Sequence, residues 1–425
     1  MDNSNIKEIN DLKALLELSK MLSKETSLDS LLQTIISSAT KVMNADRSTL
    51  FLYDEENNEL RSKIAQNLGE IKEIRLPVGK GIAGEVAEKL KSENIKDAYK
   101  DHRFNQDFDK LTGFRTKSIL CFPIFGTSKN LIGVIQVLNK KGGDTFDNYD
   151  EDLLEVFCSH AAIALERAKL IDSYIEKQRI EESFKLAREI QMSMIPNNFD
   201  FIKTNRHIDL YATIKPVYEV GGDFYDFFLL DNDLLFFCIG DVSGKGVPAA
   251  LFMAITRTLI NAFSKTDKPL DSVMTQVNKE LLLENDASMF ATIFSGILNT
   301  SNGKLSYCNC GHNPPFLITK DGHTTQIENP LNPALGIENE TIEMGSLELN
   351  FGDLIFLYTD GVTEAANRND DFFGEQKLLD LLKNNHSLLP ENLVAETFNK
   401  IRTFTDEAKQ NDDITILSIK YVLDN

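Results

Sequence analysis

Four aspartates stand where an apolar run gives way to a glycine-rich or polar turn, and they are the residues best placed to do chemistry. They are Asp223 in VGGDFYD, Asp241 in IGDVSGKG, Asp360 in LYTDGVTE and Asp412 in NDDITIL. A carboxylate at the end of a rigid strand can be directed at an ion without burying an unpaired charge. Carboxylate oxygens suit hard divalent cations. Together the four would roughly balance two such ions, which predicts a phosphate hydrolase that uses a metal-activated water.

Taken singly, each aspartate has a plainer interpretation, because Asp beside Gly is commonest as a turn residue. Four such positions at separate strand-to-turn junctions favour the catalytic interpretation. Gly222 and Gly361 would permit close backbone approach there, and the carbonyl of Val242 could itself be a ligand. No Ser/His/Asp or Cys/His pattern points to a covalent intermediate.

Composition narrows the choice of partners and compartment. The chain has 425 residues and a formal charge of −20, and it contains no run of Lys and Arg, so a nucleic-acid backbone is not expected to bind. Its five cysteines form no CxxC pair and lie mostly in apolar runs, which indicates a reducing compartment. No stretch approaches the ~20 apolar residues of a membrane span. We expect a cytoplasmic protein with no membrane partner.

The first third of the sequence has the pattern of an α+β domain. Apolar residues recur at helical spacing over 10–23 and 28–43. Residues 47–66 read as strand, turn, strand, and residues 118–126 and 131–140 form a second such pair. A long helical pattern then begins near 147 and ends before Pro196. Antiparallel strands between flanking helices predict a sensor domain over 1–165.

The last part, 199–425, predicts two packed sheets flanked by helices, an α/β sandwich. Strands are expected at 233–243, 289–299, 304–311, 314–320, 353–361 and 414–422. Helices are expected at 247–265, 374–384 and 390–404. The first of these helices is mostly apolar, so we expect it to be buried between layers.

The first domain resembles a GAF domain over residues 12–170. The phosphodiesterase and adenylyl cyclase branch of that family carries a signature reproduced here by Asn139, Lys140, Phe146, Asp150 and Glu151. The resemblance implies a salt bridge between the lysine and the aspartate near a pocket for a small molecule, a cyclic nucleotide among the candidates. Alternatively the domain serves only in dimerisation, and these charges are a solvated strand end and a helix N-terminus.

Residues 166–198 predict a helical linker between the two domains. Ile180, Phe184, Ala187 and Met194 mark one apolar face. This face indicates a parallel coiled coil in a homodimer, although the apolar positions slip from a strict heptad near 175–180. The alternative is an ordinary amphipathic helix packed on its own chain.

The C-terminal domain resembles the PPM metal-dependent serine/threonine phosphatases, the protein phosphatase 2C superfamily. It is most similar to the bacterial branch that governs sporulation and sigma-factor regulation. The matching motifs occur in the order of that branch: EIQMSMIP, VGGDFYDFF, IGDVSGKGVPAALFMA, FATIFSGIL, CGHNPPFLI, LYTDGVTEA and NDDITIL. The resemblance implies a PPM-type β-sandwich flanked by helices.

It also implies a role for each aspartate and two bound cations, Mn²⁺ or Mg²⁺. Asp241 would bridge both metals, Asp360 and Asp412 would hold the first, and Asp223 would hold the second. Many relatives have glycine where this chain has Val242, whose carbonyl would serve the second metal. Asp413 would be an alternative ligand or a support beneath the ligands.

Four more residues have open interpretations. His312 could act as a general acid or anchor a strand end. Lys245 could contact the substrate phosphate or be a solvated turn residue, and Asp226 and Glu364 could support the cluster.

By resemblance, the substrate is a phosphoserine or phosphothreonine on a STAS-type anti-sigma-factor antagonist, with hydrolysis regulated by the GAF domain. Two alternatives stay open from the sequence. One is a catalytically silent scaffold with the same fold, and the other is a nucleotide phosphodiesterase.

Overall fold

The structure is a computed structural model that divides into two compact units, Met1–Ile180 and Glu181–Asn425. It describes residues 27–62, 74–142, 145–200, 206–266, 268–283, 285–328, 332–338, 340–406 and 408–422, together with residues 13, 16, 17, 19–22, 24 and 25. Half of the positions in the helix expected over 10–23 lie outside the described residues.

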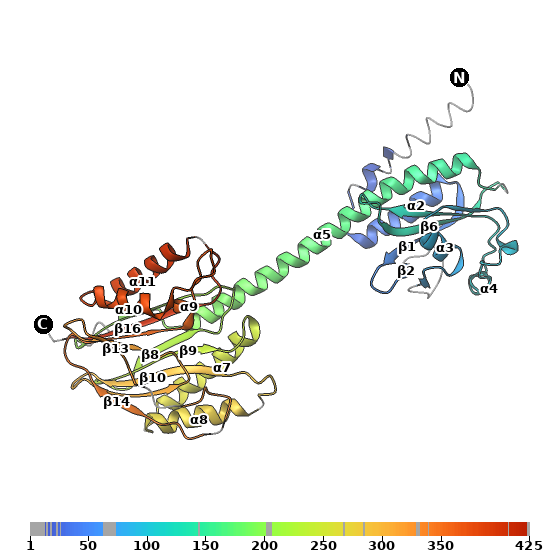
Figure 1. Ribbon diagram of the computed structural model, residues 1–425. Helices are drawn as coiled ribbons and strands as arrows, with labels where there is room; N and C mark the ends of the chain where they lie inside the picture. Colours follow the sequence, from blue (N-terminus) through green and yellow to red (C-terminus); the bar gives the residue numbers. More distant parts are fainter. Residues whose placement is uncertain are drawn as a thin grey trace. The chain divides into compact units, whose positions relative to one another are not determined.

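A six-stranded antiparallel sheet forms the centre of the first unit (Figure 1). Its strand order is β3-β2-β1-β6-β5-β4. Its strands are β1 (Ala45–Asp54), β2 (Glu59–Ser62), β3 (Ile74–Pro77), β4 (Glu93–Ile95), β5 (Ile119–Phe125) and β6 (Leu131–Lys140). The two predicted strand pairs are confirmed. The sheet is antiparallel because each pair is joined by a short turn.

Helices cover both faces of this sheet. On one face, α2 (Leu28–Val42) and the first part of α5 (Asn148–Met194) pack through residues such as Ile35 and Phe157. On the other face, α3 (Gly81–Lys89) contributes Val86 to a second apolar cluster. A short helix, α4 (Asp107–Thr112), lies in the segment between β4 and β5. The predicted α+β class of this unit is confirmed.

α5 is one uninterrupted helix of 47 residues that crosses from the first unit into the second. Its buried residues end at Ala168. Beyond that point Leu170, Tyr174 and Leu186 are 70%, 62% and 58% exposed. The helix stops just before Pro196, as predicted, since proline cannot continue the hydrogen-bond pattern.

The second unit contains two five-stranded antiparallel sheets. The first has the order β14-β11-β10-β9-β8 and the second has the order β13-β12-β15-β16-β7. Their strands are β7 (Ile208–Lys215), β8 (Phe224–Leu229), β9 (Leu234–Val242), β10 (Ala291–Asn299), β11 (Lys304–Cys310), β12 (Phe316–Ile318), β13 (Thr324–Gln326), β14 (Gly345–Glu348), β15 (Leu354–Tyr358) and β16 (Ile414–Tyr421).

The sheets pack face to face, and helices cover their outer faces (Figure 1). Alternation along β16 shows the layering, because Leu417 and Ile419 belong to the cluster between the sheets while Ile416 belongs to the cluster under the outer helices. The helices are α7 (Val247–Ser264) and α8 (Leu270–Leu282) on one side, and α9 (Asp360–Thr363), α10 (Gly374–Asn384) and α11 (Pro390–Thr405) on the other. The predicted helix-flanked β-sandwich is confirmed.

The expectation that the helix after Asp241 is buried between layers is wrong. Ala249, Met253 and Ile260 of α7 are buried, whereas Leu251 and Ile255 are 62% and 53% exposed. The helix lies on the outside of its sheet, so only one stripe meets the core. Among the described helices α7 alone has the length and hydropathy of a membrane span, which is weak support for one because its buried stripe packs in this unit.

Candidate metal centre and sensor cavity

Strand register brings the first two predicted aspartates together. β8 and β9 are antiparallel neighbours, with Phe224 opposite Gly240. Asp223 comes just before Phe224, and Asp241 comes just after Gly240. The expectation that Asp223 follows a strand is therefore wrong: it precedes one. In an antiparallel pair the start of one strand lies beside the end of its neighbour, so the two carboxylates still meet.

The second sheet places the other aspartates in the same way. Asp360 begins α9 directly after β15, whereas Asp412 and Asp413 come just before β16. β15 and β16 are antiparallel, with Tyr358 opposite Ile416. These residues therefore gather at one edge of the second sheet.

Two threonines join the two sheets at this edge. Thr359 Oγ1 and Thr415 Oγ1 donate to Asp223 Oδ2 over 2.7 Å and 2.6 Å. Both threonines are fully buried, and Asp223 is 3% exposed. These donors carry no recognisable signal in the sequence, although each lies one or two residues from a predicted ligand. They fix the orientation of a carboxylate that burial would otherwise leave without partners.

The carboxylates raise one another's pKa. Burial, together with Asp241, raises the pKa of Asp223 well above its usual value. Burial, followed by the charge of Asp360, raises the pKa of Asp241 to about 7. The pKa of Asp360 is raised by burial and then by Glu364 and Asp412. Acids that are buried close together resist ionisation unless a cation neutralises them.

Glycines allow the backbone to approach this cluster closely. A Cβ on Gly222 would lie 2.7 Å from the Val242 carbonyl oxygen, and one on Gly361 would lie 1.9 Å from the Asp413 carbonyl oxygen. Real Cβ atoms do not come so close to backbone atoms. Both positions therefore require glycine, and the Val242 carbonyl lies against the loop that carries Asp223.

Asp412 and Asp413 differ in their surroundings. Asp413 is 5% exposed, and its Oδ1 accepts the Val217 amide over 2.7 Å. The Asp412 side chain is 39% exposed, and its Oδ2 accepts from Lys245 Nζ over 2.8 Å. Asp413 thus holds the loop before Asp223, whereas Asp412 faces the open side of the cluster. Lys245 is ion-paired and is not a freely solvated turn residue.

The donor set suits a hard cation, although its side chains are not closed around one. Carboxylates and a backbone carbonyl are the oxygen ligands that Mg²⁺ and Mn²⁺ prefer. In the described part of the chain, no group of three or more His, Cys, Asp or Glu side chains has the geometry to hold a metal ion. A bound ion would therefore draw these carboxylates closer together than they lie here.

The remaining candidates lie around the cluster. His312 is buried, and its Nδ1 is 3.0 Å from Thr292 Oγ1. Burial lowers its pKa to about 4, so it is a neutral anchor at the end of β11 at pH 7. Asp226 is buried in an ion pair with Arg257 of α7, with 2.9 Å between Oδ2 and Nη2. Glu364 influences Asp360 through its charge.

The end of α5 also contacts the metal-site loop, a contact that was not predicted from the sequence. Gln191 Nε2 donates to the Gly221 carbonyl over 2.7 Å, and the Gly221 amide donates back to Gln191 Oε1 over 3.2 Å. Gly221 is two residues from Asp223. A movement of this helix end would therefore act on the loop before a predicted ligand.

In the first unit, the GAF signature residues bind one another and nearby backbone. Lys140 forms an ion pair with Asp150, as the resemblance implies. Asn139 Oδ1 accepts the Lys117 amide over 2.6 Å, and Asn94 Nδ2 donates to Glu151 Oε1 over 2.7 Å. Phe146 is 1% exposed in the core. These residues tie the end of β6 to the start of α5.

A separate cavity of about 170 Å³ lies on the other side of the sheet, lined by residues of β1, β3, β6 and α3 and of the segment between β4 and β5. None of the five signature residues lines it. Its walls are largely apolar, and Phe104, Phe108 and Phe114 come from one short segment. Those three phenylalanines in an otherwise polar stretch are the sequence signal that could have indicated it.

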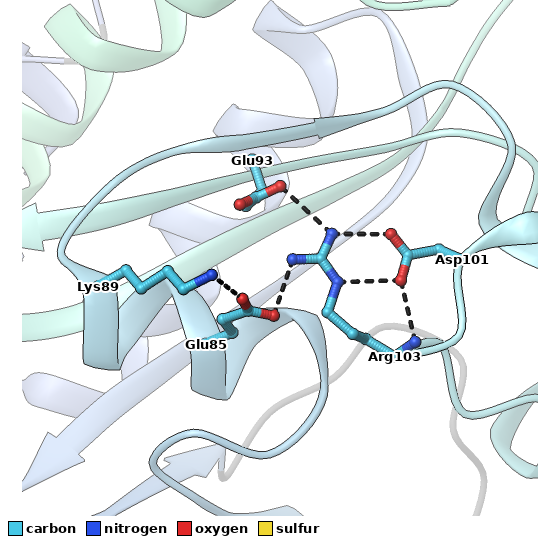
Figure 2. A network of polar contacts seen from close by, with 5 residues as sticks. All are labelled: Glu85, Lys89, Glu93, Asp101 and Arg103. Atoms are coloured by element: carbon cyan, nitrogen blue, oxygen red, sulfur yellow. Dashed lines mark hydrogen bonds and ion pairs between the residues drawn. The ribbon is translucent and has the colours of Figure 1, made fainter.

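Figure 2 shows the network that fixes one wall of this sensor cavity. Arg103, which lines the cavity, is bound by Asp101 over 2.7 Å, Glu85 over 2.7 Å and Glu93 over 3.3 Å, and Lys89 pairs with Glu85 from the other side. The Arg103 contact lowers the pKa of Asp101 to about 2. The guanidinium of Arg103 is therefore already paired with carboxylates. The other charged residues that line the cavity are Arg47 and Asp109.

Each of the two units contains a region that matches a known protein family. Residues 231–422 match the family model of stage II sporulation protein E, SpoIIE, and residues 27–165 match that of the GAF domain. The first match contains Asp241, Asp360 and Asp412, whereas Asp223 lies just ahead of it.

Known proteins resemble parts of the chain. Protein IcfG of Synechocystis sp. is 33% identical over 260 residues, which are 55% of this chain and 40% of that protein. The probable 3',5'-cyclic phosphodiesterase pde-5 of Caenorhabditis elegans is 36% identical over 195 residues, 43% of this chain and 26% of that protein, and this similarity lies in the GAF domain alone. The chain thus spans less than half the length of either relative.

The fold of the second unit also has a solved counterpart. The SiaA-PP2C domain of Pseudomonas aeruginosa superposes with a TM-score of 0.52 and 21% identity, covering 58% of this chain and 98% of that one. This chain therefore combines a region that matches the GAF domain with a region that matches the SpoIIE family and has the fold of a PP2C domain, as the sequence motifs indicated.

Proposed function

We propose that the chain is a metal-dependent protein phosphatase that hydrolyses phosphoserine or phosphothreonine on a regulatory protein. The observation that carries this proposal is the convergence of Asp223, Asp241, Asp360 and Asp412 at one edge of two packed sheets, where burial and mutual charge raise the pKa of the first three. Such a cluster is costly without cations and well suited to holding them.

We propose that Asp241 lies between two cations, Mn²⁺ or Mg²⁺. Asp360 and Asp412 would hold one, and Asp223 and the Val242 carbonyl would hold the other. The ions would supply an activated water and neutralise charge on the phosphoryl oxygens. Phosphate monoesters need both effects, since their anions resist attack by water at neutral pH.

Asp413 is proposed as a positioning residue because its carboxylate is already engaged. The Asp413 carboxylate accepts hydrogen bonds from the backbone N–H groups of Val217 and Asp223. Asp412 makes no such contact with that loop and is paired instead with Lys245 at the open side. Lys245 would leave Asp412 when a cation binds and could then meet the substrate phosphate.

The proposed regulation uses the GAF domain, taken as 1–165, through the linker 166–198 to the phosphatase domain, 199–425. A small molecule, a cyclic nucleotide among the candidates, would bind in the sensor cavity and not at the five signature residues. Val156, Ile163 and Leu170 are exposed at intervals of seven along α5, which supports a homodimeric coiled coil. A STAS-type anti-sigma-factor antagonist stays the predicted substrate, and the cytoplasm the predicted location.

One experiment separates this function from its two alternatives. Release of p-nitrophenol is measured from p-nitrophenyl phosphate and from its bis ester, with Mn²⁺, for the full chain and two matched variants. Asp241→Asn removes the central ligand, while Asp233→Asn changes an exposed aspartate in the turn between β8 and β9, at the opposite end of both strands from the cluster. We expect Mn²⁺-dependent hydrolysis of the monoester alone, lost only in Asp241→Asn.

Each alternative gives a different result. Hydrolysis of the bis ester in preference to the monoester would indicate a phosphodiesterase. Mn²⁺ binding without turnover of either ester would indicate a scaffold. Undiminished turnover by Asp241→Asn would refute the proposed metal site.

A further inference from the structure

A second cavity of about 370 Å³ lies in the phosphatase domain beside the carboxylate cluster. Its walls include Asp412 and Gly361, together with Lys245, which is paired with Asp412. Cavities that bind ligands usually span about 300–1,000 Å³, so it is large enough to take side chains of a bound peptide. It therefore adjoins the place where a phosphate would be hydrolysed.

The cavity has an excess of basic side chains, in contrast to the chain as a whole. Its basic residues are Lys215, Lys245, Arg402 and Lys409, and its acidic residues are Glu364 and Asp412. The whole chain has a formal charge of −20. Lys215 and Lys409 are exposed and form no ion pair with a described residue. Local positive charge on an acidic protein favours an anionic partner at this place.

One face of α11 supplies both charge and apolar surface to the cavity. Phe398, Ile401, Arg402 and Thr405 line it, and their spacing of three and four residues places them on one side of the helix. Phe372 also lines the cavity and is 58% exposed, so its ring is accessible to a bound peptide. Apolar surface next to lysine and arginine suits a peptide better than a bare inorganic anion.

We propose that this docking cavity binds the residues flanking the phosphorylated side chain of the substrate, and that these residues are acidic with an adjacent apolar side chain. Arg402 and Lys409 would pair with the acidic residues, and Phe372 would contact the apolar one. This inference rests on the proposed phosphatase function, because the position of the cavity has meaning only if hydrolysis occurs at the adjoining cluster.

Two phosphoserine peptides test the inference. They have the same length and the same apolar residues, but glutamates flank the phosphoserine in one and lysines in the other. Phosphate release gives kcat/KM for each peptide with the full chain and with Arg402→Glu/Lys409→Glu. The matched control is Lys383→Glu/Lys400→Glu, which makes the same charge change at exposed positions on α10 and α11 that do not line the cavity.

We expect the wild type and the control to prefer the glutamate peptide by about tenfold, since two exposed ion pairs are involved and each changes affinity by about fivefold at most. Arg402→Glu/Lys409→Glu should lose or reverse that preference. Phe372→Ser, a second variant, should raise KM for the glutamate peptide more than it lowers kcat.

The outcomes separate the two claims. Equal kcat/KM values of the wild type for the two peptides would overturn the docking cavity. The same holds if Arg402→Glu/Lys409→Glu retains the preference for the glutamate peptide, or if its kcat/KM falls by the same factor for both peptides. If the wild type does not hydrolyse p-nitrophenyl phosphate with Mn²⁺, the proposed function itself fails.

Discussion

The buried ion pair between Asp226 and Arg257 allows a quantitative prediction about what holds α7 on its sheet. Asp226 is 2% exposed on β8, and Arg257 reaches it from α7 with 2.9 Å between Nη2 and Oδ2. Among the described residues, the only other side chain that donates to this carboxylate is Asn261, with 3.4 Å between Nδ2 and Oδ2. Because β8 begins after Asp223 and α7 follows Asp241, this pair connects the elements that carry two predicted ligands.

Arg257→Met should destabilise the phosphatase domain by about 3–5 kcal/mol, because it leaves a buried carboxylate without its counterion. Burial already raises the pKa of Asp226, and Arg257 opposes that shift. A carboxyl whose pKa is higher in the folded than in the unfolded protein destabilises the fold increasingly as pH rises above its unfolded value, near 3.9. The loss in Arg257→Met should therefore be larger at pH 8 than at pH 5.

The measurement is hydrogen exchange of peptides from β8 and α7 over a urea series, which reports on this domain separately from the GAF domain. Asp226→Asn/Arg257→Met is the control, since it removes both charges and should be more stable than Arg257→Met alone. The reasoning fails if Arg257→Met stays within about 1 kcal/mol of the wild type at pH 8, or if the double variant is no better.

Three further predictions concern the surroundings of the metal site. His312 has a pKa of about 4 in the folded protein and about 6.5 in the unfolded protein, so only the unfolded state takes up a proton between pH 7 and pH 5. The free energy of unfolding of the domain should therefore fall by about 2 kcal/mol over this range. Urea titrations at the two pH values should show a smaller fall in His312→Gln. Gln191→Ala should lower kcat several-fold by releasing the loop before the cluster, whereas the exposed Gln178→Ala on the same helix should not; equal activities would contradict this role. Gly222→Ala should raise the Mn²⁺ concentration for half-maximal activity about tenfold or more, because its Cβ would meet the Val242 carbonyl at 2.7 Å; an unchanged titration would contradict it.

Local pattern predicted the elements well where it was strong. The apolar runs that became β9, β10 and β16 are long and bounded by turn residues, so their type and extent followed from the sequence. The apolar pattern did not predict the burial of α7, because a mostly apolar helix can lie between two layers or on the outside of one. Leu251 and Ile255 differ from Met253 only in the face they occupy, which is set by the position of the sheet.

Residue type indicated the candidate site, but its assembly depends on long-range pairing. Asp223 and Asp360 are far apart in the chain and adjoin strands of different sheets, and no local signal showed that Thr359 would donate to Asp223. In the sensor domain, the signature around Lys140 was recognisable as a motif, but its side chains form an ion pair with each other and do not line the cavity. The sensor cavity is formed by residues from several strands and loops, so no single segment could define it.

The most direct test of the central claim is the number of Mn²⁺ ions that must bind for turnover. Isothermal titration of Mn²⁺ into the metal-free full chain is combined with phosphate release from p-nitrophenyl phosphate at each step. We predict two ions per chain, activity that appears as the second binds, and both reduced binding and lost turnover in Asp241→Asn. Full activity in the presence of a chelator, or unchanged binding and turnover in Asp241→Asn, would contradict the account.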